Sequence, residues 1–229
     1  VKRIGEMAFG KCESLAEIEI PDSVNSIGSS AFIECENLSS VKLPSSLSEI
    51  KKSMFMNCKE LKNIDIPNST TKIGDYVFYK CSSLKEFLVP ESVKEIGKKV
   101  FAFCKLLENI QILGDIEEIS EGMFYNCTNL KKIEIPGTVK KIGANSFNKC
   151  ISLEEIKIPN GVETIGDCAF NDCVSLSKIV IPDSVVAIGY RVFDGCMNLK
   201  SISYKGKDYK SIDEFVRGFI TENQRNKNV

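Results

Sequence analysis

Residues 9–24 read FGKCESLAEIEIPDSV, and residues 170–185 read FNDCVSLSKIVIPDSV. Between these stretches the same frame of Phe, Cys, Leu, two Ile and Pro returns every 23 residues. The unit is I-G-x-x-x-F-x-x-C-x-x-L-x-x-I-x-I-P-x-x-V-x-x, and it occurs nine times without an insertion. The cysteine column comprises Cys12, Cys35, Cys58, Cys81, Cys104, Cys127, Cys150, Cys173 and Cys196. The phenylalanine column comprises Phe9, Phe32, Phe55, Phe78, Phe101, Phe124, Phe147, Phe170 and Phe193.

The unit predicts a stack of short strands. In Leu15 to Pro21, apolar and polar residues alternate, as in a strand with one buried face, and Pro ends the strand because it cannot donate to a ladder. A second extended segment, Val24 to Gly28, ends at a glycine that allows a sharp turn. The variable residues before Phe suit a helical or 3₁₀ turn. Such a short unit cannot bury its own apolar face, so the units must stack on one another.

These residues resemble the BspA-like (bacterial surface protein A-like) leucine-rich repeat family, whose signature is I-G-x-x-A-F-x-x-C-x-x-L-x-x-I-x-I-P. The match extends from Val1 to about Tyr204. The resemblance implies a right-handed, curved leucine-rich repeat superhelix with a parallel β-sheet on its concave side. Short strands or 3₁₀ turns would form the convex side. It also implies a surface or secreted protein of gut and mucosal bacteria or parasitic protists, of a kind that adheres to host matrix proteins or other cells.

Three units depart from the frame. Lys51 and Ser120 replace the glycine after Ile, which indicates that this position prefers glycine but tolerates other residues. The fifth unit has Leu113-Gly114 where Pro would stand, which predicts a different turn there.

The two ends of the chain differ. Val1 occupies the V position of a preceding unit, so the chain starts in mid-repeat, and we expect a longer protein because an uncapped solenoid end exposes its core. The frame fails at Lys205, which predicts a solenoid over residues 1–204 and a C-terminal cap over residues 205–229. Ser211 and Glu214 form a capping box, and helical apolar spacing follows as far as Ile220. We expect a helix over about residues 211–220 on the last unit and a frayed tail; a partner-binding helix is the alternative.

The composition excludes several classes of function. Thirty basic and thirty-one acidic residues give a net charge of −1, which argues against binding to nucleic acid or to an anionic membrane surface. No apolar run approaches the length that spans a bilayer, and no leader sequence is present in the chain. The chain has no His, so histidine bases and His-ligated metal sites are excluded. We expect no cofactor, no metal and no enzymatic activity.

The cysteine column allows several interpretations. Stacked units would bring successive cysteines within disulfide range, but their side chains would point in parallel into the core. Metal sites need clustered ligands, and these cysteines are 23 residues apart. We therefore expect buried, reduced thiols that pack as small hydrophobes, with disulfides as the alternative. Cys168 lies outside the column, at a position with polar counterparts in other units, so it is predicted to be the accessible thiol.

A ligand would be bound by the outward residues of the L-x-x-I-x-I-P strand. These carry charges of both signs and no aromatic ring, and the alternative is a solvated sheet face without a ligand. Charges also alternate between units, as in Lys85, Glu108, Lys131 and Glu154, which predicts pairs between neighbouring units. The candidate binding residues are Glu17, Glu19, Lys42, Asp65, Glu86, Leu88, Gln111, Lys132, Glu134, Glu155, Lys157 and Lys178.

The sequence thus predicts a non-enzymatic interaction or adhesion module. The resemblance implies that it acts at the cell surface or outside the cell, where it would bind a protein or a glycan of a host or neighbouring cell. We expect a monomer that does not insert into a membrane. A structural spacer with no ligand of its own is the alternative.

Overall fold

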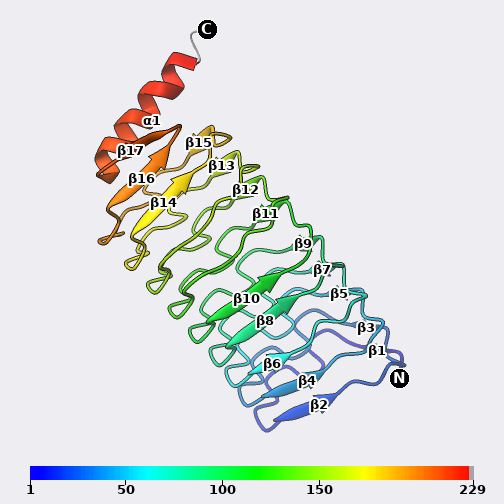
Figure 1. Ribbon diagram of the computed structural model, residues 1–229. Coiled ribbons are helices and arrows are strands. Elements are labelled where there is room, and N and C mark those ends of the chain that lie inside the picture. The colour runs from blue at the N-terminus through cyan, green and yellow to red at the C-terminus, as the bar shows by residue number, and fades with distance from the viewer. Residues whose placement is uncertain (227–229) are drawn as a thin grey trace.

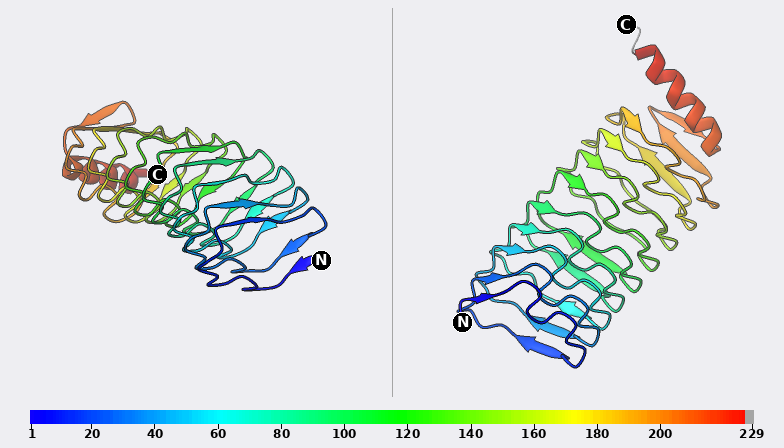
Figure 2. Two further views of the ribbon diagram at one scale, coloured as in Figure 1. Left: turned by 90° about the horizontal axis from the view of Figure 1, so that it is seen from below. Right: turned by 180° about the vertical axis from the view of Figure 1, so that it is seen from behind.

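The computed structural model describes residues 1–226, with side chains as far as Phe219. Figure 1 shows the units stacked into an elongated slab, with the N-terminus at one end and helix α1 (Ile212–Asn226) at the other. Figure 2 shows from two further sides that the stack continues without a break from the first unit to the last. The predicted solenoid of nine units is confirmed.

The first sheet is built by the L-x-x-I-x-I-P segments, whose strands pair in parallel with the next unit. Its register joins each residue to the one 23 positions on, as in Ile18 and Val41. Ladders link β2–β4–β6, β8–β10 and β14–β16. The strands are β2 (Glu17–Glu19), β4 (Ser40–Lys42), β6 (Asn63–Ile64), β8 (Glu86–Val89), β10 (Asn109–Ile112), β14 (Lys178–Ile181) and β16 (Ser201–Tyr204).

The second sheet is built by the V-x-x-I-G segments and is also parallel. Its ladders link β1–β3, β5–β7–β9 and β11–β12–β13–β15. The strands are β1 (Arg3–Ile4), β3 (Ser26–Ile27), β5 (Glu49–Ile50), β7 (Lys72–Ile73), β9 (Glu95–Ile96), β11 (Glu118–Ile119), β12 (Lys141–Ile142), β13 (Thr164–Ile165) and β15 (Ala187–Ile188).

The glycine after Ile is required by close packing between units. A Cβ on Gly189 would lie 2.4 Å from the backbone nitrogen of Asp167 in the preceding unit. Gly189 N–H donates to the Ile165 carbonyl at 2.8 Å, and the same bond forms wherever a unit with this glycine follows another unit. Neither Lys51 nor Ser120 makes this bond among the described residues, and the second sheet is interrupted at those two units. The sequence explains this glycine by its freedom to turn, and that explanation is incomplete. The second sheet continues into a unit only where that unit has glycine, which lacks a side chain, at the position after Ile.

The Phe–Cys segments consist of consecutive turns closed by the i→i+3 hydrogen bonds of a 3₁₀ turn, as from Ile33 N–H to the Ser30 carbonyl at 3.0 Å, but no continuous helix forms there in the described residues. Two residues per unit adopt left-handed backbone angles, for example Ser30 with φ 56° and Glu34 with φ 58°. These residues prevent a continuous helix. They also let alternate N–H groups reach the next unit, as when Phe32 N–H donates to the Met54 carbonyl at 2.9 Å.

The core is a continuous aromatic ladder. The nine phenylalanines of the repeat stack face to face, with ring centroids 5.1 to 5.8 Å apart and interplanar angles of 1° to 17°. Phe147 is fully buried between Phe124 and Phe170. The Ile, Leu, Val and Cys columns pack around this ladder.

A hairpin and a helix cover the last unit. Lys205 and Gly206 both have positive φ, of 50° and 70°, and turn the chain into β17 (Lys207–Tyr209), which pairs antiparallel with β16. Phe215 of α1 packs edge-on against Phe193 with a centroid distance of 6.0 Å. Ser211 Oγ accepts a hydrogen bond from Glu214 N–H at 3.1 Å, as the capping box predicts. The helix continues to Asn226, beyond its expected end and through most of the tail expected to fray. The rest of that tail, residues 227–229, lies outside the described residues.

Candidate functional site

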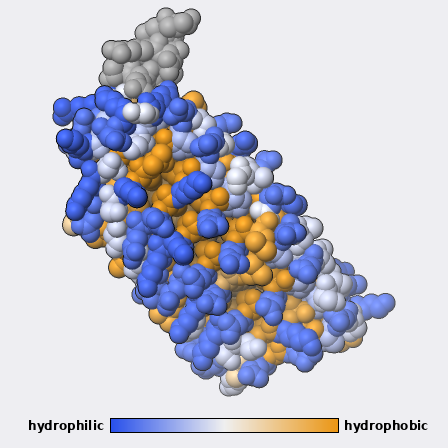
Figure 3. Space-filling view, in the orientation of Figure 1, coloured by the Kyte–Doolittle hydropathy of each residue, from blue (hydrophilic) through white to orange (hydrophobic). Residues whose placement is uncertain are grey.

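The outward side of the first sheet, here called the strand face, carries all twelve candidate binding residues. Along each strand, inward residues are buried and outward residues are exposed, as in β10, where Ile110 is buried and Gln111 is exposed. The register places Leu88 beside Gln111 and Glu19 beside Lys42 on neighbouring strands. Figure 3 shows hydrophilic side chains scattered over an apolar band on the side of the molecule that faces the viewer in Figure 1.

A shallow hollow lies on the strand face where β10 and β14 begin. Its volume is about 450 Å³, and four consecutive units, the fifth to the eighth, contribute its lining. Three candidate residues line it, namely Lys132, Glu155 and Lys178. The other lining residues are Glu108, Asn109, Lys131, Glu154 and Ser177. Both signs of charge therefore surround the hollow.

The charged side chains of the hollow are not paired. Among the described residues, Lys131, Lys132 and Lys178 form no ion pair with any carboxylate, and Glu108, Glu154 and Glu155 form none with any lysine or arginine. The predicted alternation of Lys85, Glu108, Lys131 and Glu154 therefore does not produce ion pairs. Opposite charges one unit apart do pair elsewhere, at 2.5 to 3.1 Å, in Glu19–Lys42, Glu36–Lys59, Lys72–Glu95, Lys98–Glu121 and Glu118–Lys141. The hollow thus keeps its charges available to a ligand.

The strand ladder is also interrupted at the hollow. Between β10 and β14, within the described residues, an isolated bridge of Glu134 and Lys157 and a hydrogen bond from Glu154 N–H to the Lys131 carbonyl at 3.0 Å join the sixth and seventh units, and the ladder is likewise interrupted between β6 and β8. The sixth and seventh units thus form no four-residue strand in the first sheet, unlike β10 and β14 on either side.

Five of the eight residues that line the hollow are not among the twelve candidates: Asn109 is an outward strand residue, and the other four lie just before that position. Glu108, Lys131, Glu154 and Ser177 occupy the column just before the first outward strand position. Their charge alternation was visible in the sequence, but it indicated pairing between units. The column of Lys131 and Glu154 directly precedes the outward column of Lys132 and Glu155 in the sequence. This adjacency was the signal that both columns line the same part of the strand face.

The comparison with known families decides what the chain is. The sequence matches the BspA-type leucine-rich repeat region in six copies, over residues 2–131 and 117–217. The chain belongs to the BspA-type leucine-rich repeat family. This confirms the resemblance carried by the Ile-Gly, Phe, Cys and Ile-x-Ile-Pro positions.

Solved structures of bacterial leucine-rich repeat proteins resemble this chain in fold. A leucine-rich repeat protein from Bacteroides ovatus is 32% identical, with a TM-score of 0.82, and the match covers 89% of this chain and 59% of that one. A leucine-rich cell surface protein from Faecalibacterium prausnitzii is 31% identical, with a TM-score of 0.69, over 89% of this chain and 64% of that one. The pneumococcal vaccine antigen PcpA is 25% identical, with a TM-score of 0.53, over 89% of this chain and 54% of that one.

This BspA-type chain therefore spans less than two thirds of the length of these first two structures. Comparison with curated proteins gave no match.

The cysteine of this BspA-type repeat is a hydrogen-bond donor. From Cys35 to Cys196, each thiol of the column donates to the carbonyl of the phenylalanine in the preceding unit, with Sγ···O distances of 2.9 to 3.2 Å. That carbonyl also accepts the N–H of the cysteine in its own unit, as Phe101 does from Cys104. The thiol thus ties two units together from inside the core, which alanine could not do.

Burial raises the pKa of these thiols. The pKa of Cys104, Cys127 and Cys150 lies well above the ordinary value, because burial disfavours the thiolate. Near the C-terminal end, burial raises the pKa of Cys196 to about 12. The prediction of buried thiols is confirmed for the column from Cys35 onward, whereas Cys12, in the first described unit, is exposed.

Cys168 is half-buried, at a left-handed turn position with φ 54°. Among the described thiols, Cys168 is thus less exposed than Cys12 and more exposed than the rest of the column.

The different burial of the thiols predicts their reactivity. In the folded chain, two of the ten thiols, Cys12 and Cys168, should react readily with a chromogenic disulfide reagent, and Cys12 should react faster. The others should react only after unfolding in urea. A double variant, Cys12→Ser with Cys168→Ser, should show almost no fast phase. A third fast thiol in the parent would contradict the burial of the column.

Neither a metal centre nor a membrane span is found in the part of the chain that the structure describes. No three Cys, Asp or Glu side chains there lie close enough together to hold a metal ion. No helix is both long enough and apolar enough to cross a bilayer.

Proposed function

We propose that the chain is a non-enzymatic binding module that recognises a protein outside the cell through the strand face. The observation that carries the proposal is the hollow, where six charged side chains from consecutive units face solvent without an ion pair. A charged side chain that is already in an ion pair must give up its partner to bind a ligand. The charged side chains of the hollow have no such partner to lose.

The strand face fits a protein better than a small molecule. The hollow is shallow and lined by polar and charged groups, whereas small-molecule sites are enclosed and mostly apolar. Charges of both signs give orientation and selectivity against a surface with the complementary pattern. Leu88, which is 49% exposed, adds an apolar contact nearby on the same face. The face has no aromatic anchor, so binding should depend on many modest contacts.

An extracellular location is supported by the family and by the neighbours. The Faecalibacterium structure is described as a cell surface protein, and PcpA is described as a vaccine antigen. We expect the chain to act as a monomer on or outside the cell.

The test uses purified fibronectin, fibrinogen, laminin and collagen on a biosensor surface. The parent chain should bind at least one of them, and the double variant Lys132→Glu with Lys178→Glu should bind at least about tenfold more weakly, because two ammonium groups become carboxylates. Neither lysine takes part in an ion pair of the described residues, so folding should be unaffected.

The matched control reverses two lysines away from the strand face. Lys52→Glu with Lys149→Glu makes the same charge change, and other units carry Glu6 and Glu34 at the corresponding positions. This control should bind as the parent does. Equal binding by both double variants would place the site on another surface. Absence of binding by the parent to every protein of the panel would favour a spacer.

A further inference from the structure

A row of four aromatic side chains lies on the outer side of the Phe–Cys segments in the fourth, fifth and sixth units. We call it the aromatic row; it comprises Tyr76, Tyr79, Phe103 and Tyr125. Successive ring centroids are 5.7, 5.3 and 5.2 Å apart, and the rings meet edge to face. All four rings are partly exposed, in contrast to the fully buried phenylalanine ladder beneath them. The row is therefore an aromatic surface separate from the core.

Two lysines lie over the aromatic row. Lys80 Nζ is 5.6 Å from the ring centroid of Tyr79 and 5.9 Å from that of Phe103. Lys99 Nζ is 5.9 Å from the ring centroid of Tyr76. These are cation–π distances. Neither ammonium group forms an ion pair with a described carboxylate, so both positive charges remain available above the rings.

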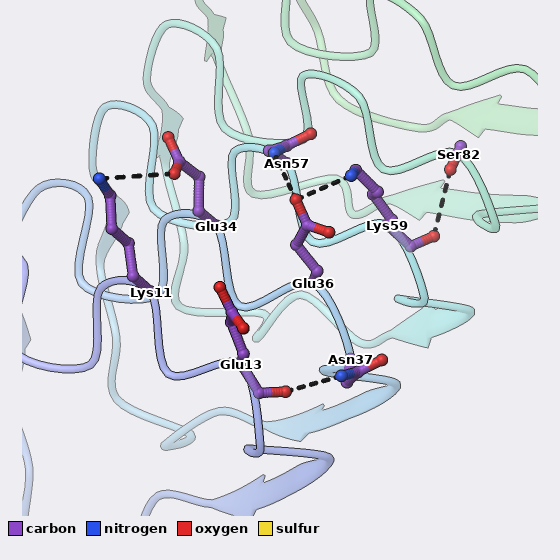
Figure 4. A network of polar contacts seen from close by, with 8 residues as sticks. All are labelled: Lys11, Glu13, Glu34, Glu36, Asn37, Asn57, Lys59 and Ser82. Atoms are coloured by element: carbon purple, nitrogen blue, oxygen red, sulfur yellow. Dashed lines mark hydrogen bonds and ion pairs between the residues drawn. The ribbon is translucent and has the colours of Figure 1, made fainter.

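The same side of the stack is occupied differently in the first units. Figure 4 shows Lys11 paired with Glu34 and Lys59 paired with Glu36, each across one unit. In the column of Lys11 and Glu34, the next residues are Asn57, Lys80 and Phe103, so the carboxylates end where the aromatic row begins. Lys80, which is in this column, therefore has no carboxylate at the same position in the next unit, unlike Lys11.

The turns do not require aromatic residues. Phe103 has φ 64° and Tyr76 has φ 59°, left-handed angles that bulky residues rarely adopt. Other units place Asn57 and Asn126 in the column of Phe103, and Asn tolerates this conformation better. The rings therefore contribute a surface and are not needed for the backbone.

We propose that the aromatic row, with Lys80 and Lys99, binds an anionic glycan whose sugar rings carry carboxylate or sulfate groups. The C–H faces of sugars pack on aromatic rings, and the two ammonium groups supply the charge that such a glycan needs. The hydroxyl groups of Tyr76, Tyr79 and Tyr125 form no hydrogen bond with the described residues, so they are available to sugar hydroxyls.

The succession of rings favours a glycan over an acidic protein segment. The rings follow one another across three units at nearly equal steps, as the sugars of a polysaccharide do. Two ammonium groups beside four rings also suit a polymer that combines sugar rings with carboxylate or sulfate groups. This site is separate from the strand face, and its assignment does not depend on the function proposed above.

Calorimetric titration with chondroitin sulfate oligosaccharides of defined length tests the proposal, with dextran oligosaccharides as the neutral comparison. The parent should bind the sulfated oligosaccharide at least about tenfold more tightly than dextran. Phe103→Asn with Tyr125→Asn, and separately Lys80→Gln with Lys99→Gln, should each raise the Kd at least about tenfold. Asn is already present in both aromatic columns, at Asn57 and Asn148, so the first variant should fold.

Several results would overturn the assignment. No binding by the parent would do so, as would an unchanged Kd in both double variants. Poly-L-glutamate bound as tightly as the oligosaccharide would assign the row to an acidic protein segment instead. Lys132→Glu with Lys178→Glu should keep the glycan affinity of the parent, which separates this site from the strand face. If the asparagine variant has a lowered thermal midpoint, the surface pair of Lys80→Gln and Lys99→Gln still tests the site.

Discussion

Raising the pH from about 8 to about 10 is expected to unfold the protein through its cysteine column. Seven thiols, from Cys58 to Cys196, are enclosed in the core, and burial raises the pKa of each one. In the unfolded chain the same thiols ionise near pH 8.5, about their ordinary pKa. Above that pH the folded state holds more protons than the unfolded state, so stability falls as the pH rises.

The size of this effect follows from the number of thiols. Each thiol that stays protonated only in the folded state costs about 1.4 kcal/mol per pH unit. Seven thiols together cost roughly 10 kcal/mol per pH unit once the unfolded chain is fully ionised, which is comparable with the entire stability of a typical domain. Below about pH 8 the thiols are mostly protonated in both the folded and the unfolded chain. Their contribution to the free energy of unfolding should therefore change little with pH there.

Urea unfolding at about pH 7, 8, 9 and 10, with a reductant present, measures the effect. A triple variant, Cys81→Ala with Cys104→Ala and Cys127→Ala, provides the control. It should be less stable than the parent at neutral pH, because three hydrogen bonds to phenylalanine carbonyls are lost. Its stability should also fall less steeply with pH. Equal slopes for the two proteins would assign the alkaline transition to groups other than the thiols.

Phe147→Ala should lower the free energy of unfolding by roughly 3–5 kcal/mol. The ring is fully buried, and it stacks on Phe124 at 5.4 Å and on Phe170 at 5.3 Å, so its removal leaves a cavity in the middle of the ladder. The backbone of the stack is held by hydrogen bonds between units and cannot easily collapse into that cavity. Urea unfolding of parent and variant at neutral pH gives the difference.

Phe9→Ala is the matched comparison for this substitution. Phe9 is only partly buried and stacks on one ring, Phe32, at 5.1 Å. Its removal should cost clearly less than that of Phe147. If both substitutions shifted the unfolding midpoint equally, position within the ladder would not determine the cost, and the ladder would not be the continuous core described above.

The fold could be predicted from the sequence because every unit repeats the same physical requirements. Alternation around Ile18 and Ile20, the strand-ending Pro21 and the capping box at Ser211 each predicted a local structure that forms. The role of the repeat glycine was harder to predict, since freedom to turn and lack of a Cβ both favour glycine. Only the stacked backbone shows that Gly189 is needed for close approach and that Lys51 interrupts the sheet.

The candidate sites were less predictable because they depend on departures from the repeat. The outward residues of the strands were correctly placed on one exposed face, but the hollow arises where side chains one unit apart fail to pair. Whether Lys131 meets Glu154 depends on side-chain directions, which the spacing does not determine. The aromatic row was missed because Tyr79 and Phe103 lie in different columns, which adjoin one another only once the turns are built.

The contacts of each unit with only its immediate neighbours have a mechanical consequence. A load applied to the two ends of the chain is resisted at any moment by the bonds of one terminal unit, not by the whole stack. Each unit of 23 residues that peels away adds roughly 80 Å of extended chain while the remaining units keep their shape. The protein should lengthen under tension in equal steps and dissipate work at each one, as an extensible tether does.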